Sequence, residues 1–246
     1  MGALFRVLTA ASAFAFLTGA AGAATIQVAQ ETSAGAGDFD ANILGYISPF
    51  ESALTAEEFY QYNNPAGSSY NGDQNGGPVA VDGLTIIYFL DGSDGLSLGV
   101  VHDAASDGSG GSITTSWSLL GDTADFLLRD DVSDAYTLSG GGTLFEASNA
   151  WVGCCTDGYA LGSLDGSWSL TGEFLSGATG ISDWLVAGSG GGFLDLDFVS
   201  GQRIRLSAVS DTPEPPPVPL PASFPLLLAG LSSIGIARAL RRESKI

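Results

Sequence analysis

The sequence predicts an all-β domain, an antiparallel β-sandwich or a jelly-roll-like fold, from three observations. Short segments rich in Val, Ile, Leu, Phe and Trp recur along the chain at intervals of about 8–12 residues. Gly, Asp and Ser, which suit tight turns, separate these segments. No long amphipathic helical pattern competes with them. Two packed sheets of short strands joined by turns satisfy all three observations.

The clearest strand candidates alternate between apolar and polar residues. Residues 194–198 (LDLDF) and 203–207 (RIRLS) each predict one buried face and one face in water. In chain order, the expected strands are 79–90, 96–101, 113–120, 126–129, 135–138, 143–146, 167–175, 182–187, 193–198 and 203–209.

Residues 24–77 are the least regular part of the expected domain. One short helix is predicted near Thr55 to Tyr60, and Asn-Gly and Gly-Gly steps in 63–77 mark turns. We expect 24–77 to be an irregular lead-in, either part of the β domain or packed on it, with the sandwich itself at 78–211.

The charge of the central region is strongly negative. Between Thr25 and Asp211 the chain has three basic and 25 acidic residues, a net charge of −22. Such a surface repels phosphate backbones, which argues against nucleic acid as a partner. It keeps an exported protein soluble, and it also attracts divalent cations.

The N-terminal residues are typical of a secretory signal. A short start containing Arg6 is followed by an apolar run, residues 7–18, that is too short to span a bilayer. Ala21 and Ala23 then supply the small side chains that a signal peptidase requires. We predict a removable signal peptide at 1–23, cleaved after Ala23 or Ala24.

The C-terminal residues change composition abruptly. Six prolines between Pro213 and Pro221 predict an extended linker at 212–222. An apolar stretch follows, and we predict a single transmembrane helix with a basic cytoplasmic tail at 223–246. The basic residues that stop the helix are Arg238, Arg241 and Arg242. Because basic residues stay cytoplasmic, the β domain is expected across the inner membrane, as the signal peptide also indicates.

The order of these C-terminal features resembles a known sorting signal. Val218, Pro219, Leu220, Pro221 and Ala222, followed by a hydrophobic helix and an arginine-rich end, are similar to the VPLPA type of PEP-CTERM signal in exopolysaccharide-producing Gram-negative bacteria. The resemblance covers residues 213–246 only.

The resemblance implies processing by an exosortase, a membrane-embedded cysteine transpeptidase-like enzyme that cuts near the motif and releases or re-attaches the protein. The precursor would be anchored in the inner membrane through its C-terminal helix, and the product would reach the envelope or the medium. An ordinary C-terminal anchor on a proline stalk is the alternative interpretation.

Cys154 and Cys155 are the only cysteines, and they are adjacent. In an oxidising compartment they can bond to each other, bond between chains or stay free. Their Cα atoms are about 3.8 Å apart, closer than in ordinary disulfides. We interpret the pair as a structural turn, with contact to a ligand as the second choice.

Several acidic clusters offer carboxylates to calcium, but none has the spacing of a known calcium loop. These clusters lie at 91–95, 103–111, 130–134 and 195–197. Asp and Gly are also the residues of turns, so no cofactor is expected, and calcium somewhere in the domain is the one alternative.

No catalytic signature stands out. His102 is the only histidine and is expected in a turn at a strand end, and no Gly-x-Ser-x-Gly elbow accompanies it. A carboxylate pair for glycoside hydrolysis would be an arbitrary choice among so many acidic residues.

Three functions from different classes follow. The first is a non-enzymatic envelope or extracellular-matrix protein associated with exopolysaccharide. The second is a calcium-assisted, lectin-like sandwich in which exposed Trp151, Trp168 or Trp184 would stack on sugar rings, although tryptophan in an all-β domain more often lies in the core. The third is a polysaccharide-modifying enzyme.

Overall fold

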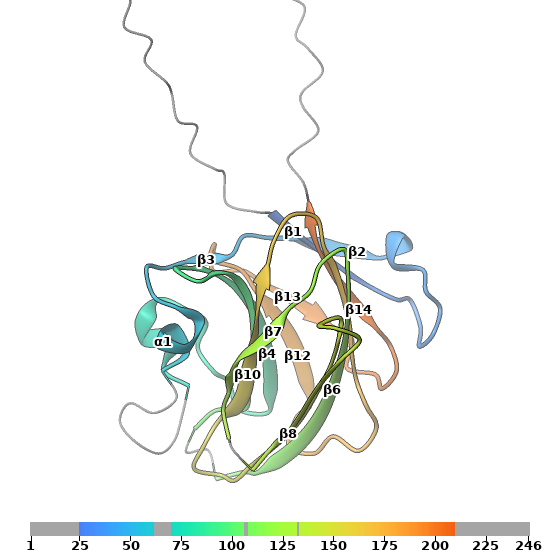
Figure 1. Cartoon of the computed structure of the whole chain (residues 1–246). Coiled ribbons are helices and arrows are strands. Elements are labelled where there is room, and N and C mark those ends of the chain that lie inside the picture. The colour runs from blue at the N-terminus through green and yellow to red at the C-terminus, as the bar shows by residue number, and fades with distance from the viewer. Residues whose placement is uncertain (1–24, 62–69, 106–107, 132, 210–246) are drawn as a thin grey trace, which may run out of the picture.

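The computed structural model describes residues 25–61, 70–105, 108–131 and 133–209. Within these ranges the chain forms two β-sheets that pack face to face, with 14 strands and one five-residue α-helix (Figure 1). The all-β prediction is therefore confirmed. The predicted signal peptide, proline linker, sorting motif and C-terminal helix lie outside the described residues. Among the described residues, no helix is long and apolar enough to cross a membrane.

The first sheet, sheet A, has the strand order β2-β1-β14-β11-β6-β9-β8, and its neighbouring strands are antiparallel. Its strands are β1 (Thr25–Gln30), β2 (Ile43–Ile47), β6 (Gly111–Leu120), β8 (Ala135–Ser139), β9 (Leu144–Trp151), β11 (Ser169–Phe174) and β14 (Ile204–Val209). Thr25 lies opposite Val209 in the β1–β14 pair. The two ends of the described chain therefore meet at one place, as Figure 1 shows.

The second sheet, sheet B, has the order β13-β12-β4-β5-β10-β7, with β3 also beside β4. Its strands are β3 (Phe50–Glu51), β4 (Leu84–Gly92), β5 (Gly95–His102), β7 (Asp125–Arg129), β10 (Asp157–Leu164), β12 (Asp183–Ala187) and β13 (Phe193–Leu196). Both β12 and β3 pair with β4 in parallel, so sheet B is mixed, whereas sheet A is antiparallel as predicted. The chain passes from β11 in sheet A to β12 in sheet B. After this crossover β12 runs in the same direction as β4, which is why the two strands pair in parallel.

The main core lies between the two sheets and contains most of the large apolar side chains. All four tryptophans are buried, with exposed fractions of 5% or less. Trp168 stacks on Phe89 with ring centroids 5.3 Å apart, and Trp184 meets the ring of Phe174 edge-on at 5.5 Å. The hypothesis that exposed tryptophans stack on sugars is therefore wrong, because these rings are buried. Burial of such large aromatic rings stabilises the fold.

A second, smaller core covers the outer face of sheet B. It is formed by the helix α1 (Ala56–Tyr60), by Tyr70, which precedes the short 3₁₀ turn η2 (Gly72–Asn75), and by apolar side chains of β4, β5, β10 and β12. The predicted helix is confirmed. Thr55 accepts a hydrogen bond from the Glu58 amide, and the Glu58 carboxylate accepts one from the Thr55 amide, which closes a capping box. This helix holds Tyr60 against the sheet.

The structure differs from the sequence-based expectations in three segments. Residues 24–77, expected to be irregular, contribute β1 and β2, and β1 lies inside sheet A. The strand expected from residue 79 begins at Leu84. Strand β10, which the sequence pattern did not predict, contains three glycines or serines that resemble turn residues. Its Gly158 is required by packing, because a Cβ there would lie 2.1 Å from the Val100 carbonyl oxygen.

Candidate functional site: a buried carboxyl cluster

One end of the sandwich brings together polar side chains from both sheets and from the helix. We call this group the carboxyl cluster. Its members are Asp130 after β7, Asp134 before β8, Tyr136 in β8, Asn149 in β9, Asp157 at the start of β10 and Tyr60 at the end of α1.

Strand register explains why residues so far apart in the sequence meet. β10 pairs with β7, and next to that pairing the Asp130 amide donates to the Gly158 carbonyl at 3.2 Å. This contact places Asp130 beside the first residue of β10, Asp157. Asn149 reaches Asp157 from the opposite sheet with an Nδ2–Oδ1 distance of 3.0 Å. The cluster therefore spans the interface between the sheets.

The side-chain amide of Asn149 is at the centre of the cluster. Its Nδ2 lies 2.9 Å from Asp134 Oδ2, 2.8 Å from the Tyr136 hydroxyl and 3.0 Å from Asp157 Oδ1. The Tyr136 hydroxyl donates to the Gly158 carbonyl at 3.0 Å. An amide nitrogen carries two hydrogens, so it cannot donate to all three neighbouring oxygens.

Several polar atoms of the cluster have no hydrogen-bond partner among the described residues. They are Asp130 Oδ1, Asn149 Oδ1 and Asp157 Oδ2. The three residues are buried, with exposed fractions of 4%, 2% and 1%. An unpaired polar atom in the interior costs about 1–3 kcal/mol, so the hydrogen bonding of the cluster is incomplete as it stands.

Burial and mutual repulsion change the acidity of the carboxyl groups. Burial raises the pKa of Asp130 to about 9, and the charge of Asp157 adds to this effect. Burial and the charge of Asp134 raise the pKa of Asp157 to about 8. Among the described residues, none of these three carboxyl groups forms an ion pair with a basic side chain. These carboxyl groups therefore have no directly paired cation among the described residues, although the guanidinium of Arg129 lies over the Tyr136 ring, 5.7 Å from its centroid.

His102, expected in a turn, is instead fully buried as the last residue of β5. Its Nδ1 lies 2.9 Å from the Thr85 hydroxyl, and its ring stacks on Trp151 with centroids 5.7 Å apart. Burial lowers the pKa of His102 to about 3, so the ring is neutral. The structure thus packs this histidine in the core, with the buried hydroxyl of Thr85 beside Nδ1.

Asp103 does not orient His102. Its Oδ1 accepts from the Gly83 amide at 2.8 Å and its Oδ2 accepts from the Trp151 indole at 2.7 Å. The backbone of Asp103 has a positive φ of 64°. These hydrogen bonds hold that strained turn in place, which is a structural role.

Cys154 and Cys155 lie in the connection from β9 to β10, and their sulfurs form a vicinal disulfide with an S–S distance of 2.07 Å. The Cys155 amide donates to the Val152 carbonyl at 2.9 Å, which closes a tight turn. The next residue, Thr156, accepts from the Tyr70 amide at 2.8 Å. The disulfide therefore lies two residues before Asp157, next to the carboxyl cluster.

The other acidic segments serve local structure or face solvent. Both carboxylate oxygens of Asp94 accept from the Ala56 amide at the start of α1. Asp195 is exposed on β13. Of the four acidic clusters identified in the sequence, the one at 130–134 forms part of the carboxyl cluster. In the fold Asp157 and Asn149 lie beside it. The sequence offered no local signal for these two residues.

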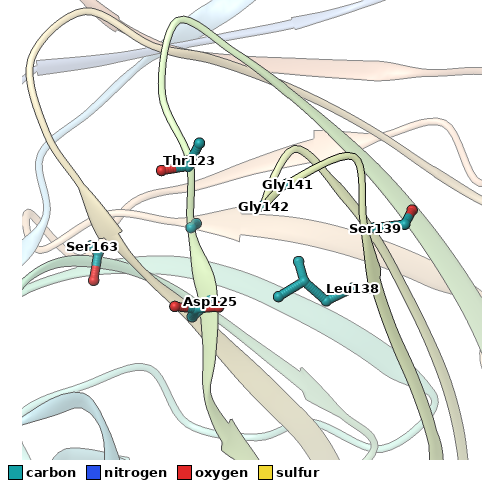
Figure 2. A pocket seen from close by; sticks show the side chains of 8 residues that line it. Thr123, Asp125, Leu138, Ser139, Gly141, Gly142 and Ser163 are labelled. Carbon is teal, nitrogen blue, oxygen red and sulfur yellow. The ribbon is translucent and has the colours of Figure 1, made fainter.

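Three open depressions lie outside the carboxyl cluster, and the third of them, of about 230 Å³, is lined by Thr137, Glu146 and their neighbours. The first, of about 360 Å³, is lined by Thr123, Asp125, Leu138 and small residues, and Figure 2 shows Leu138 pointing toward the segment that carries Thr123 and Asp125. The second, of about 290 Å³, is lined by Tyr46, Phe193 and a glycine-rich turn. Tyr46 and Phe193 are 56% and 49% exposed, so aromatic surface is accessible there.

No family model, curated protein or solved structure matches the chain. Within the part of the chain that the structure describes, no group of three or more His, Cys, Asp or Glu side chains is arranged to hold a metal ion.

Proposed function

We propose that this protein is exported, sorted by an exosortase and delivered to the cell envelope or extracellular matrix, where it associates with exopolysaccharide without catalysing a reaction. The observation that carries the proposal is the agreement of two signals at opposite ends of the chain. A signal peptide pattern precedes the β domain, and the Val218 to Ala222 motif with its apolar and basic flank follows it.

The geometry of the β domain is compatible with tethering at a single point. Because Thr25 pairs with Val209, both ends of the described chain leave the sandwich at the same place. A linker attached after β14 would therefore leave the opposite end of the sandwich, with its loops, free to contact polymer. The net charge of −22 between Thr25 and Asp211 favours solubility in that setting.

Burial of the carboxyl cluster favours a non-enzymatic function. The raised pKa values of Asp130 and Asp157 would suit a general acid, but the exposed fractions of these residues are only 4% and 1%. A catalytic acid or base has to reach the group that it protonates or deprotonates. The open depressions offer two carboxylates, Asp125 and Glu146, and these line separate depressions rather than one site.

The test is the mass of both termini in protein purified from the envelope and the medium of the organism that makes it. We expect an N-terminus near Ala24 and a C-terminus between Val218 and Ala222. A chain that still ends at Ile246 in a strain with an active exosortase would overturn the sorting proposal.

A matched pair of variants sharpens this test. Replacing Pro219 and Pro221 by Ala alters the motif, and we expect uncleaved chain to accumulate. Replacing Pro215 and Pro216 by Ala shortens the proline run but leaves the motif intact, and cleavage should continue. Equal processing of the two variants would show that the motif is not recognised.

Calcium-assisted carbohydrate binding is a second candidate, favoured by the depression at Tyr46 and Phe193. These exposed rings flank Ser48 and a glycine-rich backbone, so apolar faces and polar groups are available together. We expect the Tyr46→Ala, Phe193→Ala double variant to lose binding to purified exopolysaccharide in affinity electrophoresis. Val79→Ala removes a comparably exposed side chain elsewhere and should leave binding unchanged. Loss of binding on adding a chelator would make the interaction calcium-assisted.

A further inference from the structure

We propose that the carboxyl cluster is a calcium site, in which Asp134, Asp157 and the side-chain oxygen of Asn149 bind the ion and water completes the coordination. This inference concerns a bound ion and goes beyond sorting and polymer association. It is independent of both.

Oxygen atoms from separate segments converge in the cluster. Asp134 Oδ2 and Asp157 Oδ1 lie 2.9 and 3.0 Å from one point, the Nδ2 of Asn149. A half-turn of the Asn149 amide about its last torsion exchanges Nδ2 and Oδ1 and moves no other atom. Three oxygens from separate segments then surround a common space. Calcium binds oxygen ligands at about 2.3–2.6 Å in flexible geometry, which suits such an arrangement.

The cluster also contains buried oxygen atoms that have no hydrogen-bond partner among the described residues. Asn149 Oδ1 and Asp157 Oδ2 accept no hydrogen bond from the described residues, although their residues are 2% and 1% exposed. Burying a carboxylate without a counter-charge is unfavourable. One divalent cation balances the charges of Asp134 and Asp157. It supplies a partner for Asp157 Oδ2 and, after the half-turn of the amide, for Asn149 Oδ1.

The cluster is accessible to water and offers the types of ligand that calcium binds. Asp134 is half-buried, so the site opens to water on its side, and water is a normal calcium ligand. The site needs two carboxylates and one amide oxygen. It is therefore compatible with the finding that the described residues contain no group of three or more His, Cys, Asp or Glu side chains suited to a metal.

The position of the site predicts that a bound ion links the two sheets. Asn149 belongs to β9 in sheet A and Asp157 to β10 in sheet B. An ion bound by both residues joins the two sheets at one end of the sandwich. Calcium should therefore raise the unfolding temperature, because a ligand that binds only the folded state stabilises it.

The test uses the purified full chain, stripped of metal with a chelator and titrated with calcium chloride by calorimetry. We expect saturable binding with a Kd of about 10⁻⁴–10⁻³ M, as in extracellular calcium modules. Asp134→Asn should weaken binding at least about tenfold, because it removes a ligand charge. Asp195→Asn, which removes the same charge from an exposed position on β13, should bind as the unmodified chain does.

A second variant keeps the proposal testable if Asp134→Asn is poorly folded. Asn149→Asp adds a carboxylate at the centre of the cluster. We expect it to unfold at a lower temperature in chelator, because like charges repel, and to recover at least the unmodified chain's temperature in calcium.

Absence of saturable calcium binding would overturn the proposal. So would equal affinities for the Asp134→Asn and Asp195→Asn variants, or a failure of calcium to restore the Asn149→Asp variant. In each of these cases Asn149 serves only as a hydrogen-bond donor between carboxyl groups. The masses of the chain termini test sorting separately, so either proposal can fail without the other.

Discussion

The hydroxyl of Tyr60 donates a hydrogen bond to Asp130 Oδ2 at 2.9 Å, and both residues are buried. This contact joins the end of α1 to the end of β7, 70 residues further along the chain. The tyrosine ring packs edge-on against Tyr70, with centroids 4.9 Å apart, in the small core outside sheet B. The helix thus closes the carboxyl cluster on its outer side.

Replacing Tyr60 by Phe should lower the free energy of unfolding by about 1–3 kcal/mol, because it leaves a buried acceptor unpaired. Asp130 Oδ1 already has no partner among the described residues, so neither carboxyl oxygen would then be satisfied. Urea unfolding measures the change. Tyr46→Phe, at an exposed tyrosine that accepts from Gln27, is the control and should change stability little. Similar losses in the two variants would contradict the prediction.

The ion pair between Glu31 and Arg203 should make stability depend on acidic pH. Burial alone would raise the pKa of Glu31, but hydrogen bonds from Arg203 and Gly37, together with the guanidinium charge, lower it from 4.5 to about 2. A carboxyl group with a depressed pKa in the folded state stabilises the fold above its unfolded pKa. That contribution is lost as the pH falls from 4.5 through about 2.

The measurement compares urea unfolding of the unmodified chain and Glu31→Gln across this pH range. The difference between them should be largest above pH 4.5 and shrink as the pH falls toward 2. Glu51→Gln changes an exposed carboxylate and serves as the control. A difference that stays constant with pH would show that Glu31 contributes through packing alone.

Replacing Trp184 by Ala should destabilise the domain by about 3–5 kcal/mol, the usual cost of removing a large buried aromatic side chain. Its ring is fully buried and meets Phe174 and Phe198 edge-on, with centroids 5.5 and 6.0 Å away. Phe193→Ala, at a ring that is 49% exposed, should cost far less. Denaturant unfolding of both variants checks the contrast, and equal costs would contradict the core position of Trp184.

Reduction of the Cys154–Cys155 bond should leave the domain folded. A bond between neighbouring residues closes almost no loop, so it removes little entropy from the unfolded chain, about 1 kcal/mol or less. Alkylation before and after reduction, read by intact mass, should modify both cysteines only after reduction. A disulfide-linked dimer on a non-reducing gel would show instead that the cysteines pair between chains.

Much of the local structure is legible in the sequence because it depends on near neighbours. The alternation in 194–198 and 203–207 predicts two strands, and the structure has β13 and β14 there. Thr55 and Glu58 have the spacing of a capping box, and a helix begins beside them. Acidity and turn chemistry are likewise properties of composition and short segments.

Tertiary structure alone decided which segments meet. The sequence pattern does not contain the parallel pairing of β12 with β4, since the partner of a strand is set by the path of the chain between sheets. The glycines and serine of β10 are typical of a turn in the sequence. In the structure Gly158 belongs to a strand, where it allows close packing against the Val100 carbonyl.

The candidate site was likewise predicted in part by the local sequence and decided in part by long-range strand pairing. The sequence marks Asp130 and Asp134 as an acidic cluster, but Asp157 and Asn149 join them only through strand register across both sheets. Burial of His102 and of the four tryptophans was decided in the same way. Composition sets the charge and turns of this chain, whereas long-range pairing determines which charges are buried together, because register is a property of the whole fold.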